Sequence, residues 1–368
     1  MTHLPAHLAA IEHIYLDRSA RDEPLTARVL DRLPGLPLTE REDEAGPVEH
    51  PGTGQALWLR RFKGRFLRPC PGTRIYHCCA YQIAHIGENC PMSCTYCILQ
   101  AYFQDRTLKV WTNRDDFLEE LDRTFSEDPT RRWRIGTGEF TDSLALEALT
   151  GLSGDLVEFL GRFPNVCLEL KSKIVDLSWT PRVPRPDRVL PAWSLNAPQI
   201  VATQEQGTAS LEERLQAART CADAGFKVCL HFDPIIHFPG WQEGYSRTIK
   251  MIGDMLAPEH VAYISLGSFR HMPELAGIIA RRHPQAGYVH GEFVPGLDGK
   301  MRLLRPLRVE QFTFLAARLT ALGFGPALYF CMESDEVWRA VLGRTPGEFG
   351  GLGRYLMDRA FGGERDSG

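Results

Sequence analysis

The stretch GENCPMSCTYCILQAYF, residues 87–103, gathers Cys90, Cys94 and Cys97 at C-x3-C and C-x2-C spacings. A structural zinc site takes four protein ligands, whereas a four-iron cluster is normally held by one thiolate per iron. Three cysteines would leave one iron of such a cluster without a protein ligand. Because an open coordination position is typical of catalytic metal sites, the stretch predicts a metal centre that reserves one position for a small molecule.

Two other interpretations of these thiols stay open. His77, Cys78 or Cys79 can supply a fourth zinc ligand, although they lie on or before the first predicted strand. Free cysteines also occur in apolar cores, but the segment NCPMSCTYC is too polar for a core strand. The rival class is therefore a zinc-stabilised nucleic-acid-binding module without catalysis.

The composition is that of a globular protein. The 368 residues are 43% hydrophobic and 24% charged, with a net charge of −4. This balance does not indicate affinity for nucleic acid over the whole surface. Ten cysteines without a signal-peptide pattern favour a reducing compartment, where clustered thiols bind metals or react. We therefore expect a cytoplasmic protein.

The middle of the chain alternates between short apolar runs and helical patterns, which predicts parallel strands joined by helices. The predicted strands are Tyr81–Ile86, Trp133–Gly136, Val166–Leu170, Val189–Leu195, Lys227–Phe232 and Val261–Leu266. The predicted helices are Asp115–Phe125, Gly154–Arg162, Leu211–Ala224 and Gly244–Leu256. The fold class is α/β, a partial (β/α)6-type barrel over residues 71–270, preceded by an N-terminal extension, 1–70, and followed by a C-terminal capping and substrate region, 271–368.

Polar side chains follow the predicted strands where each strand ends. Functional groups of barrels of this kind lie just after the carboxyl ends of the strands. We therefore expect the site at this edge, built from the segments GTGEFTD (136–142), LKSK (170–173), SLN (194–196), HFDP (231–234) and GSFRH (267–271).

A three-cysteine loop after a first strand resembles that of the radical S-adenosylmethionine enzymes. Tyr96, before the last cysteine, matches an aromatic position of that family, and Thr137-Gly138-Glu139 resembles its strand end that meets the methionine amino group. The resemblance implies a 4Fe-4S cluster on the three cysteines, S-adenosylmethionine on the open iron, and a 5′-deoxyadenosyl radical. It also implies a reducing electron donor such as flavodoxin or ferredoxin.

Further segments resemble the spore photoproduct lyase family: CTYCILQ, LKSKIVDL (170–177), SLN (194–196), GTASLEERLQAA (207–218) and PGWQEGY (239–245). The resemblance implies that Gly138, Glu139 and Lys171 bind S-adenosylmethionine. It places Ser194 and Asn196 near the same cofactor and gives Tyr96 both a cofactor contact and a catalytic role in radical relay. The implied substrate is a methylene-bridged thymine dimer in DNA.

The sequence departs from this family at two positions and in the late arginine–tyrosine pair that contacts the lesion. Arg302 and Arg305 lie in that late region, but no tyrosine occurs between Tyr288 and Tyr329.

Phe140 stands where the family has its hydrogen-donating cysteine, and Ile98 stands where a second relay tyrosine belongs. Cys229 and Cys331 are candidate donors, although a buried strand position explains both thiols as well. A radical enzyme acting on a different, non-DNA substrate is therefore the second hypothesis.

Overall fold

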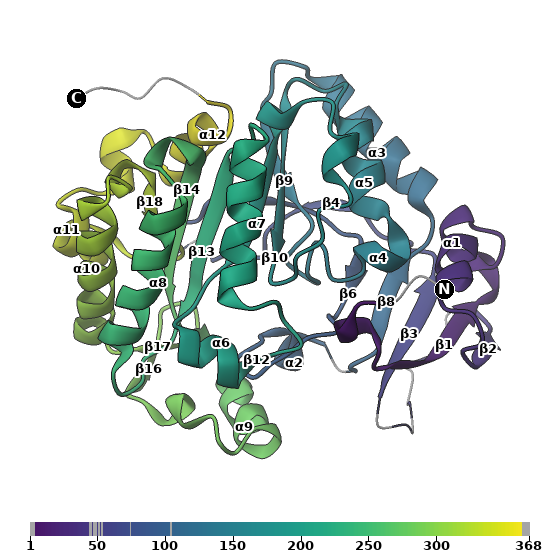
Figure 1. Ribbon diagram of the computed structural model, residues 1–368, viewed down its shortest axis with the longest axis horizontal. Helices are drawn as coiled ribbons and strands as arrows, with labels where there is room; N and C mark the ends of the chain where they lie inside the picture. The colour runs from purple at the N-terminus through teal and green to yellow at the C-terminus, as the bar shows by residue number, and fades with distance from the viewer. Residues whose placement is uncertain are drawn as a thin grey trace.

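The computed structural model describes residues 4–43, 46, 50, 52, 54–73, 75–103 and 105–362, and its largest element is an eight-stranded sheet (Figure 1). The strand order is β18-β14-β13-β11-β10-β9-β5-β4, and all neighbours run parallel except β4 and β5. In chain order the strands are β4 (Leu67–Pro69), β5 (Gln82–Ala84), β9 (Trp133–Gly136), β10 (Val166–Ser172), β11 (Val189–Ser194), β13 (Val228–Ile235), β14 (Val261–Ser268) and β18 (Leu328–Phe330). All six predicted strands are confirmed, and β18 adds a seventh parallel strand.

Helices cover the outer face of this sheet and join its strands (Figure 1). They are α3 (Arg114–Glu127), α4 (Glu147–Thr150), α5 (Leu152–Leu160), α6 (Pro198–Gln204), α7 (Leu211–Asp223), α8 (Trp241–Met255), α10 (Arg305–Ala321), α11 (Asp335–Leu342) and α12 (Leu352–Ala360). The start of α7 follows its sequence closely. Ser210 Oγ accepts from the Glu213 amide at 3.2 Å, and Glu213 Oε2 accepts from the Ser210 amide at 2.7 Å. This reciprocal cap satisfies two otherwise unpaired amides at the helix start.

The sheet curls, because side chains from distant strands meet on its concave side. Arg134 on β9 donates to the Tyr263 hydroxyl on β14 at 3.2 Å, although three strands separate β9 from β14. Glu169 on β10 accepts from the Tyr263 hydroxyl and lies 3.0 Å from His231 Nε2 on β13. A flat sheet would hold these groups far apart, since neighbouring strands are about 4.8 Å apart. The predicted partial barrel is thus confirmed.

A short segment beside β18 links the two ends of the curled sheet. His77 forms an antiparallel bridge with Glu333, and the Met332 amide donates to the His77 carbonyl at 3.1 Å. The segment 76–80 leads directly into β5, whereas Glu333 follows β18. Trp338 on α11 is fully buried and packs on Phe330 at 4.9 Å between ring centroids, so the C-terminal segment covers this side of the barrel.

The N-terminal residues form a second sheet that lies beside the barrel (Figure 1). Its order is β2-β1-β3-β8-β6, with β3 and β8 parallel. The two strands nearest the barrel come from within the predicted barrel region, so the extension and the barrel share a sheet. The bounds are β1 (Ile11–Asp17), β2 (Leu38–Arg41), β3 (Gln55–Arg60), β6 (Gly87–Glu88) and β8 (Leu108–Trp111), with α1 (Pro24–Arg32) packed against them.

The predicted boundaries at residues 70 and 270 stay predictions. Among the described residues, none of the helices has both the length and the apolar character that a bilayer crossing requires.

The buried carboxylate at the centre of the barrel predicts a specific loss of stability in acid. Burial alone would raise the pKa of Glu169, but His231, Arg134 and Lys171 outweigh it and lower this pKa to about 2. The stabilisation is therefore present above the unfolded value near 4.5 and lost as the pH falls toward 2. Between pH 5 and pH 2 we expect this group to remove about 3 kcal/mol from the free energy of unfolding.

The measurement is urea unfolding of the wild type and Glu169→Gln across this pH range. Glu169→Gln should be less stable than the wild type at pH 7, because Arg134 loses its buried partner, and should lack this part of the acid dependence. Glu212→Gln, at an exposed position on α7, is the matched control and should keep the wild-type slope. Equal slopes for Glu169→Gln and the wild type would contradict the assignment.

Candidate functional site

The carboxyl ends of β9, β10, β11 and β13 meet at one edge of the curled sheet, because these strands are parallel neighbours. Glu139, Lys171, Asn196 and Asp233 follow or end these strands, as the sequence predicts. The cysteine loop leaves the carboxyl end of β5 at the same edge. The predicted segments are therefore brought together.

Backbone pairing fixes the cysteine loop against the segment after β11. The two-residue strand β7 (Ser93–Cys94) pairs antiparallel with β12 (Glu205–Gln206). The Thr95 amide donates to the Gln204 carbonyl at 2.9 Å, and the Thr95 hydroxyl donates to the Gln204 side chain at 2.8 Å. The cysteine loop is thus held on two sides, by β5 in front of it and by β12 across from it.

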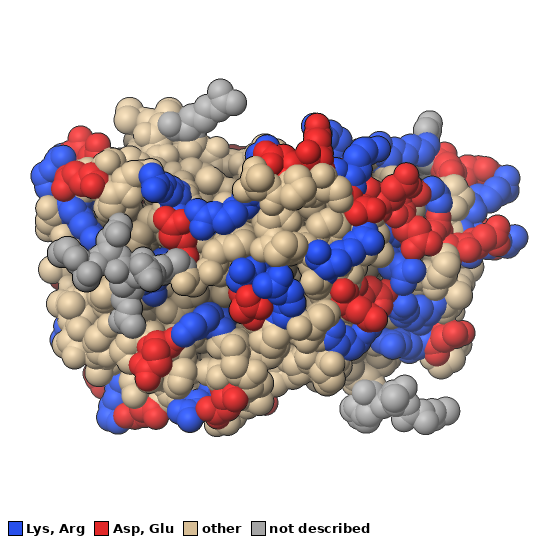
Figure 2. Space-filling view, turned by 90° about the horizontal axis from the view of Figure 1, so that it is seen from above, with Lys and Arg blue, Asp and Glu red and all other residues tan. Residues whose placement is uncertain are grey.

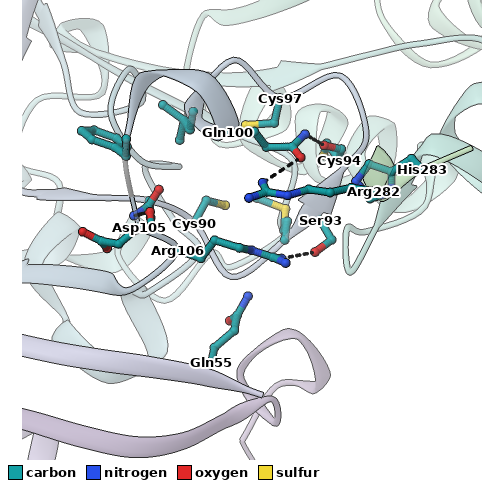
Figure 3. A pocket seen from close by; sticks show the side chains of 14 residues that line it. Gln55, Cys90, Ser93, Cys94, Cys97, Gln100, Asp105, Arg106, Arg282 and His283 are labelled. Atoms are coloured by element: carbon teal, nitrogen blue, oxygen red, sulfur yellow. Dashed lines mark hydrogen bonds between the residues drawn. The ribbon is translucent and has the colours of Figure 1, made fainter. Parts of the chain in front are cut away.

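Cys90, Cys94 and Cys97 line one cavity of about 90 Å³ (Figure 3). In this view their sulfur atoms lie around the same hollow, which Gln55 and Arg106 border from other segments. The lining does not include His77, Cys78 or Cys79, so these residues add no ligand to this cavity. The three cysteines of the motif are therefore the thiols that share it.

Burial keeps the three thiols protonated in the absence of a cation. It raises the pKa of Cys94 to about 12 and raises the pKa values of Cys90 and Cys97 above their usual range. The described residues contain no group of three His, Cys, Asp or Glu side chains already placed to hold a metal ion. The donor set still fits an iron–sulfur cluster, because three soft ligands face one cavity and metal binding would displace their protons.

Tyr96 lies beside the cavity and donates from its buried hydroxyl to Glu205. Glu205 is also ion-paired with Arg214, at 2.7 Å, and both side chains are fully buried. The Lys173 ammonium lies 5.6 Å from the centre of the Tyr96 ring. Burial, and then the charge of Glu205, raise the pKa of Tyr96 well above its usual value, so the phenol is neutral.

Sequence reasoning missed Glu205, Arg214 and Lys173. No local motif marks Glu205, because its partner Tyr96 is 109 residues away in the chain. Arg214 follows the capping residue Glu213 directly, and a buried arginine inside a capped helix is a signal only once burial is known. Lys173 alternates with Lys171 along the same strand end, so the sequence alone does not show which of the two reaches the site.

Glu139 and Lys171 form an opposite-charge pair at the carboxyl edge, with Nζ and Oε2 3.9 Å apart. Burial lowers the pKa of Lys171, but Glu139, Glu169 and Asp233 outweigh it and raise this pKa above its usual value. Lys171 is thus an ammonium and Glu139 faces it as a carboxylate. Such a pair matches the carboxylate and the ammonium of an amino acid.

Gly138 lets the two neighbouring strand ends approach each other closely. A Cβ atom at this position would lie 2.8 Å from the Lys171 carbonyl oxygen and 3.0 Å from Ser143 Oγ. The first separation is shorter than real Cβ contacts and the second is tighter than most of them, so the glycine allows Glu139 to lie beside Lys171.

Asn196 and Ser194 end β11 inside the site, and both are buried. The Asn196 amide donates to the Pro234 carbonyl at 3.0 Å and accepts from the Tyr245 hydroxyl at 2.6 Å. The Ser194 carbonyl accepts from Arg214 at 2.8 Å. Asn196 therefore joins the end of β11 to β13 and to α8, while the cofactor contacts of both residues stay predictions.

Phe140 occupies an aromatic cluster instead of presenting a reactive group. It packs with Tyr81 and Ile83, and its ring centre lies 4.9 Å from that of His85. Ile98 is partly exposed at the start of α2 (Leu99–Tyr102). The structure thus supplies no relay or hydrogen-donating group at either position.

The comparisons with known proteins identify the class of this site. Residues 77–289, more than half of the chain, match the family model described as spore photoproduct lyase. The chain belongs to the spore photoproduct lyase family, as the sequence motifs predicted. The matched region includes every predicted site residue.

Individual relatives agree with this assignment. The chain is 20% identical over 256 residues to spore photoproduct lyase of Clostridium acetobutylicum, a match that covers 68% of this chain and 76% of the relative. It is 23% identical over 256 residues to the Bacillus subtilis protein of the same name, covering 68% and 75%. A solved variant of spore photoproduct lyase with bound AdoMet and dinucleoside spore photoproduct superposes with a TM-score of 0.74. That likeness covers 87% of this chain and 98% of the other at 18% identity, and it establishes the fold.

The cavity lining predicts which cysteines bind metal. Cys94→Ala should reduce the iron of the anaerobically purified protein from about four atoms per chain to near zero, because one of three ligands is lost. Cys78→Ala is the matched control and should keep the iron, since Cys78 lies outside the cavity. Iron and sulfide analysis of both variants is the measurement. Full iron content in Cys94→Ala, or zinc without iron in the wild type, would refute the ligand assignment.

Proposed function

We propose that this chain is a radical S-adenosylmethionine enzyme that cleaves a methylene-bridged thymine dimer of DNA, with a cluster held by Cys90, Cys94 and Cys97. The observation that carries the proposal is that these thiols line one cavity within a chain of the spore photoproduct lyase family. A 4Fe-4S cluster with S-adenosylmethionine supplies a 5′-deoxyadenosyl radical, which abstracts a hydrogen atom from the substrate.

Glu139 and Lys171 orient the amino-acid end of S-adenosylmethionine in this proposal. The carboxylate of Glu139 accepts from the methionine ammonium, and the ammonium of Lys171 donates to the methionine carboxylate. Gly138 holds the two side chains at the required separation. Ser194 and Asn196 line the adjoining strand end, where the hydrogen bonds of Asn196 to Pro234 and Tyr245 keep that edge in place.

Tyr96 has a defined proton acceptor. Its hydroxyl proton points to Glu205, whose negative charge is compensated by Arg214. Loss of an electron from a phenol is easier when its proton can move to a nearby carboxylate. Tyr96 is therefore suited to one-electron relay even though Ile98 provides no second tyrosine.

Arg302, which lies in the late region that the family resemblance assigns to the lesion, contacts a tyrosine from a distant part of the chain. Its guanidinium carbon lies 4.0 Å from the centre of the Tyr76 ring. The guanidinium is buried and paired with Asp298 at 2.8 Å. Arg302 therefore positions Tyr76. Tyr76 is partly exposed, whereas Arg302 is buried.

Positive side chains border the cysteine cavity on its outer side. Arg282 donates to Gln100 at 3.3 Å and Arg106 donates to Ser93 at 3.4 Å (Figure 3). A low-potential reductant such as flavodoxin or ferredoxin would bind here if its own surface is acidic, because complementary charge speeds association. Figure 2 shows the two signs of charge interspersed on another face, without a broad basic patch.

A different substrate is the second candidate function, and Phe140 favours it. This side chain cannot return a hydrogen atom to a product radical. It packs instead in a cluster with Tyr81 and Ile83. A non-DNA substrate would retain the same cofactor chemistry.

Product analysis separates the two candidates. Dithionite-reduced protein is incubated with S-adenosylmethionine, with and without dinucleoside spore photoproduct, and thymine products and 5′-deoxyadenosine are quantified. We expect both products, with Cys94→Ala yielding neither. If 5′-deoxyadenosine forms but thymine is not restored, the lesion is not the substrate and the second candidate function remains. If iron-loaded wild-type protein forms neither product, both candidate functions are rejected.

A further inference from the structure

The segment that links the ends of the barrel carries a second group of thiols. The bridge between His77 and Glu333 brings the segment before β5, which contains Cys79, alongside the residues after β18, which begin with Cys331. The Cys331 amide donates to the Leu266 carbonyl at 3.2 Å, so this residue continues β18 alongside β14. Cys331 therefore follows the carboxyl end of β18, at the edge that holds the site.

Cys79 and Cys331 contact each other directly. Their side chains share a hydrogen bond, and Cys331 Sγ also accepts from Arg270 Nη2 at 3.7 Å. Arg270 is held in turn by Asp233, at 3.3 Å. Both thiols are free of disulfide bonds. Cys331 is thus held by its backbone bond to β14 and by the side chain of Arg270.

The hydrogen bond gives the two sulfurs different roles. Donation from Cys331 and from Cys78 lowers the pKa of Cys79 well below its usual value, and the charge of Arg134 adds to this effect. Donation to Cys79, followed by burial, raises the pKa of Cys331. Cys79 is therefore the more acidic thiol of the pair, and Cys331 is the one that holds its proton more firmly.

The pair adjoins both Phe140 and the charged groups at the cofactor end of the site. Cys79 packs against the cluster of Tyr81, Ile83 and Phe140. Cys331 lies beside Arg270, whose partner Asp233 belongs to β13 at the carboxyl edge of the sheet. Cys79 thus adjoins the position that lacks a hydrogen donor, and Cys331 adjoins the charged groups of the site.

We propose that Cys331 is the hydrogen-atom donor of this enzyme, with Cys79 as its partner. This inference rests on the proposed function for the existence of a product radical. It assigns to β18 and the segment before β5 the role that Phe140 cannot perform.

Hydrogen return requires the two cysteines, one electron from an external reductant and one proton. The carbon radical of the product takes the hydrogen atom of Cys331, which forms one C–H bond, breaks one S–H bond and leaves a thiyl radical. The thiyl joins Cys79, in its thiolate form, in a three-electron sulfur–sulfur bond of net charge −1. One electron from the low-potential reductant that serves the cluster and one proton restore the thiol and the thiolate.

The first arm of the test follows product formation in D2O with dinucleoside spore photoproduct. Wild-type thymine product should carry one solvent-derived deuterium, because the S–H exchanges with solvent. Cys331→Ser keeps the shape of the site but presents an O–H bond that is too strong to give up a hydrogen atom. Its yield of thymine per 5′-deoxyadenosine should fall about tenfold or more. Cys221→Ala, a buried thiol on α7, is the control and should match the wild type.

The second arm needs no substrate. Anaerobic holoprotein is treated with diamide, a thiol oxidant, and its peptides are mapped by mass spectrometry. A Cys79–Cys331 disulfide is expected in the wild type and in Cys221→Ala. Its absence from the wild type, or a wild-type thymine yield from Cys331→Ser, overturns the inference.

The two arms also distinguish this inference from the proposed function. If the wild type makes 5′-deoxyadenosine but no thymine, the lesion assignment fails. The peptide map still tests whether Cys79 and Cys331 form a reactive pair. A specific Cys79–Cys331 disulfide would support such a pair acting on another substrate, and its absence would reject the pair.

Discussion

The buried contact between Glu169 and its partners on three other strands is the constraint on which the site depends. Arg134, His231 and Tyr263 reach this carboxylate across the concave side of the sheet, which they can do only if the sheet curls. The curl turns the carboxyl ends of the strands toward a common centre. A buried charge without partners would cost several kcal/mol, so the network also selects the curled arrangement over flatter ones.

Two consequences for chemistry follow from this curl. The strand ends of β9 and β10 bring Glu139 to Lys171, a pair that suits an amino acid ligand. The end of β18 brings Cys331 to the same edge, next to a segment that originates before β5. A single sheet thus presents an ion pair and a pair of thiols, to which we assign cofactor binding and hydrogen return, although neither group is contiguous in the sequence.

Local patterns in the sequence predict much of the fold. The strands and the helix α7 follow from short apolar runs and from the cap between Ser210 and Glu213, both of which act over a few residues. The cysteine loop is recognisable because its three thiols lie close together in the chain, between residues 90 and 97. The second sheet was missed because its strands lie in separate parts of the chain, with β8 inserted after the cysteine loop.

Long-range contacts account for the rest of the site. The hydrogen-bond acceptor of Tyr96, the placement of Lys173 beside that ring and the contact of Cys79 with Cys331 all depend on tertiary packing.

Electron paramagnetic resonance of the dithionite-reduced protein reports on whether Cys90, Cys94 and Cys97 hold a cluster with an open iron. We expect a reduced-cluster signal that changes when S-adenosylmethionine is added. A signal that ignores S-adenosylmethionine, or no iron–sulfur signal in iron-loaded protein, would contradict it.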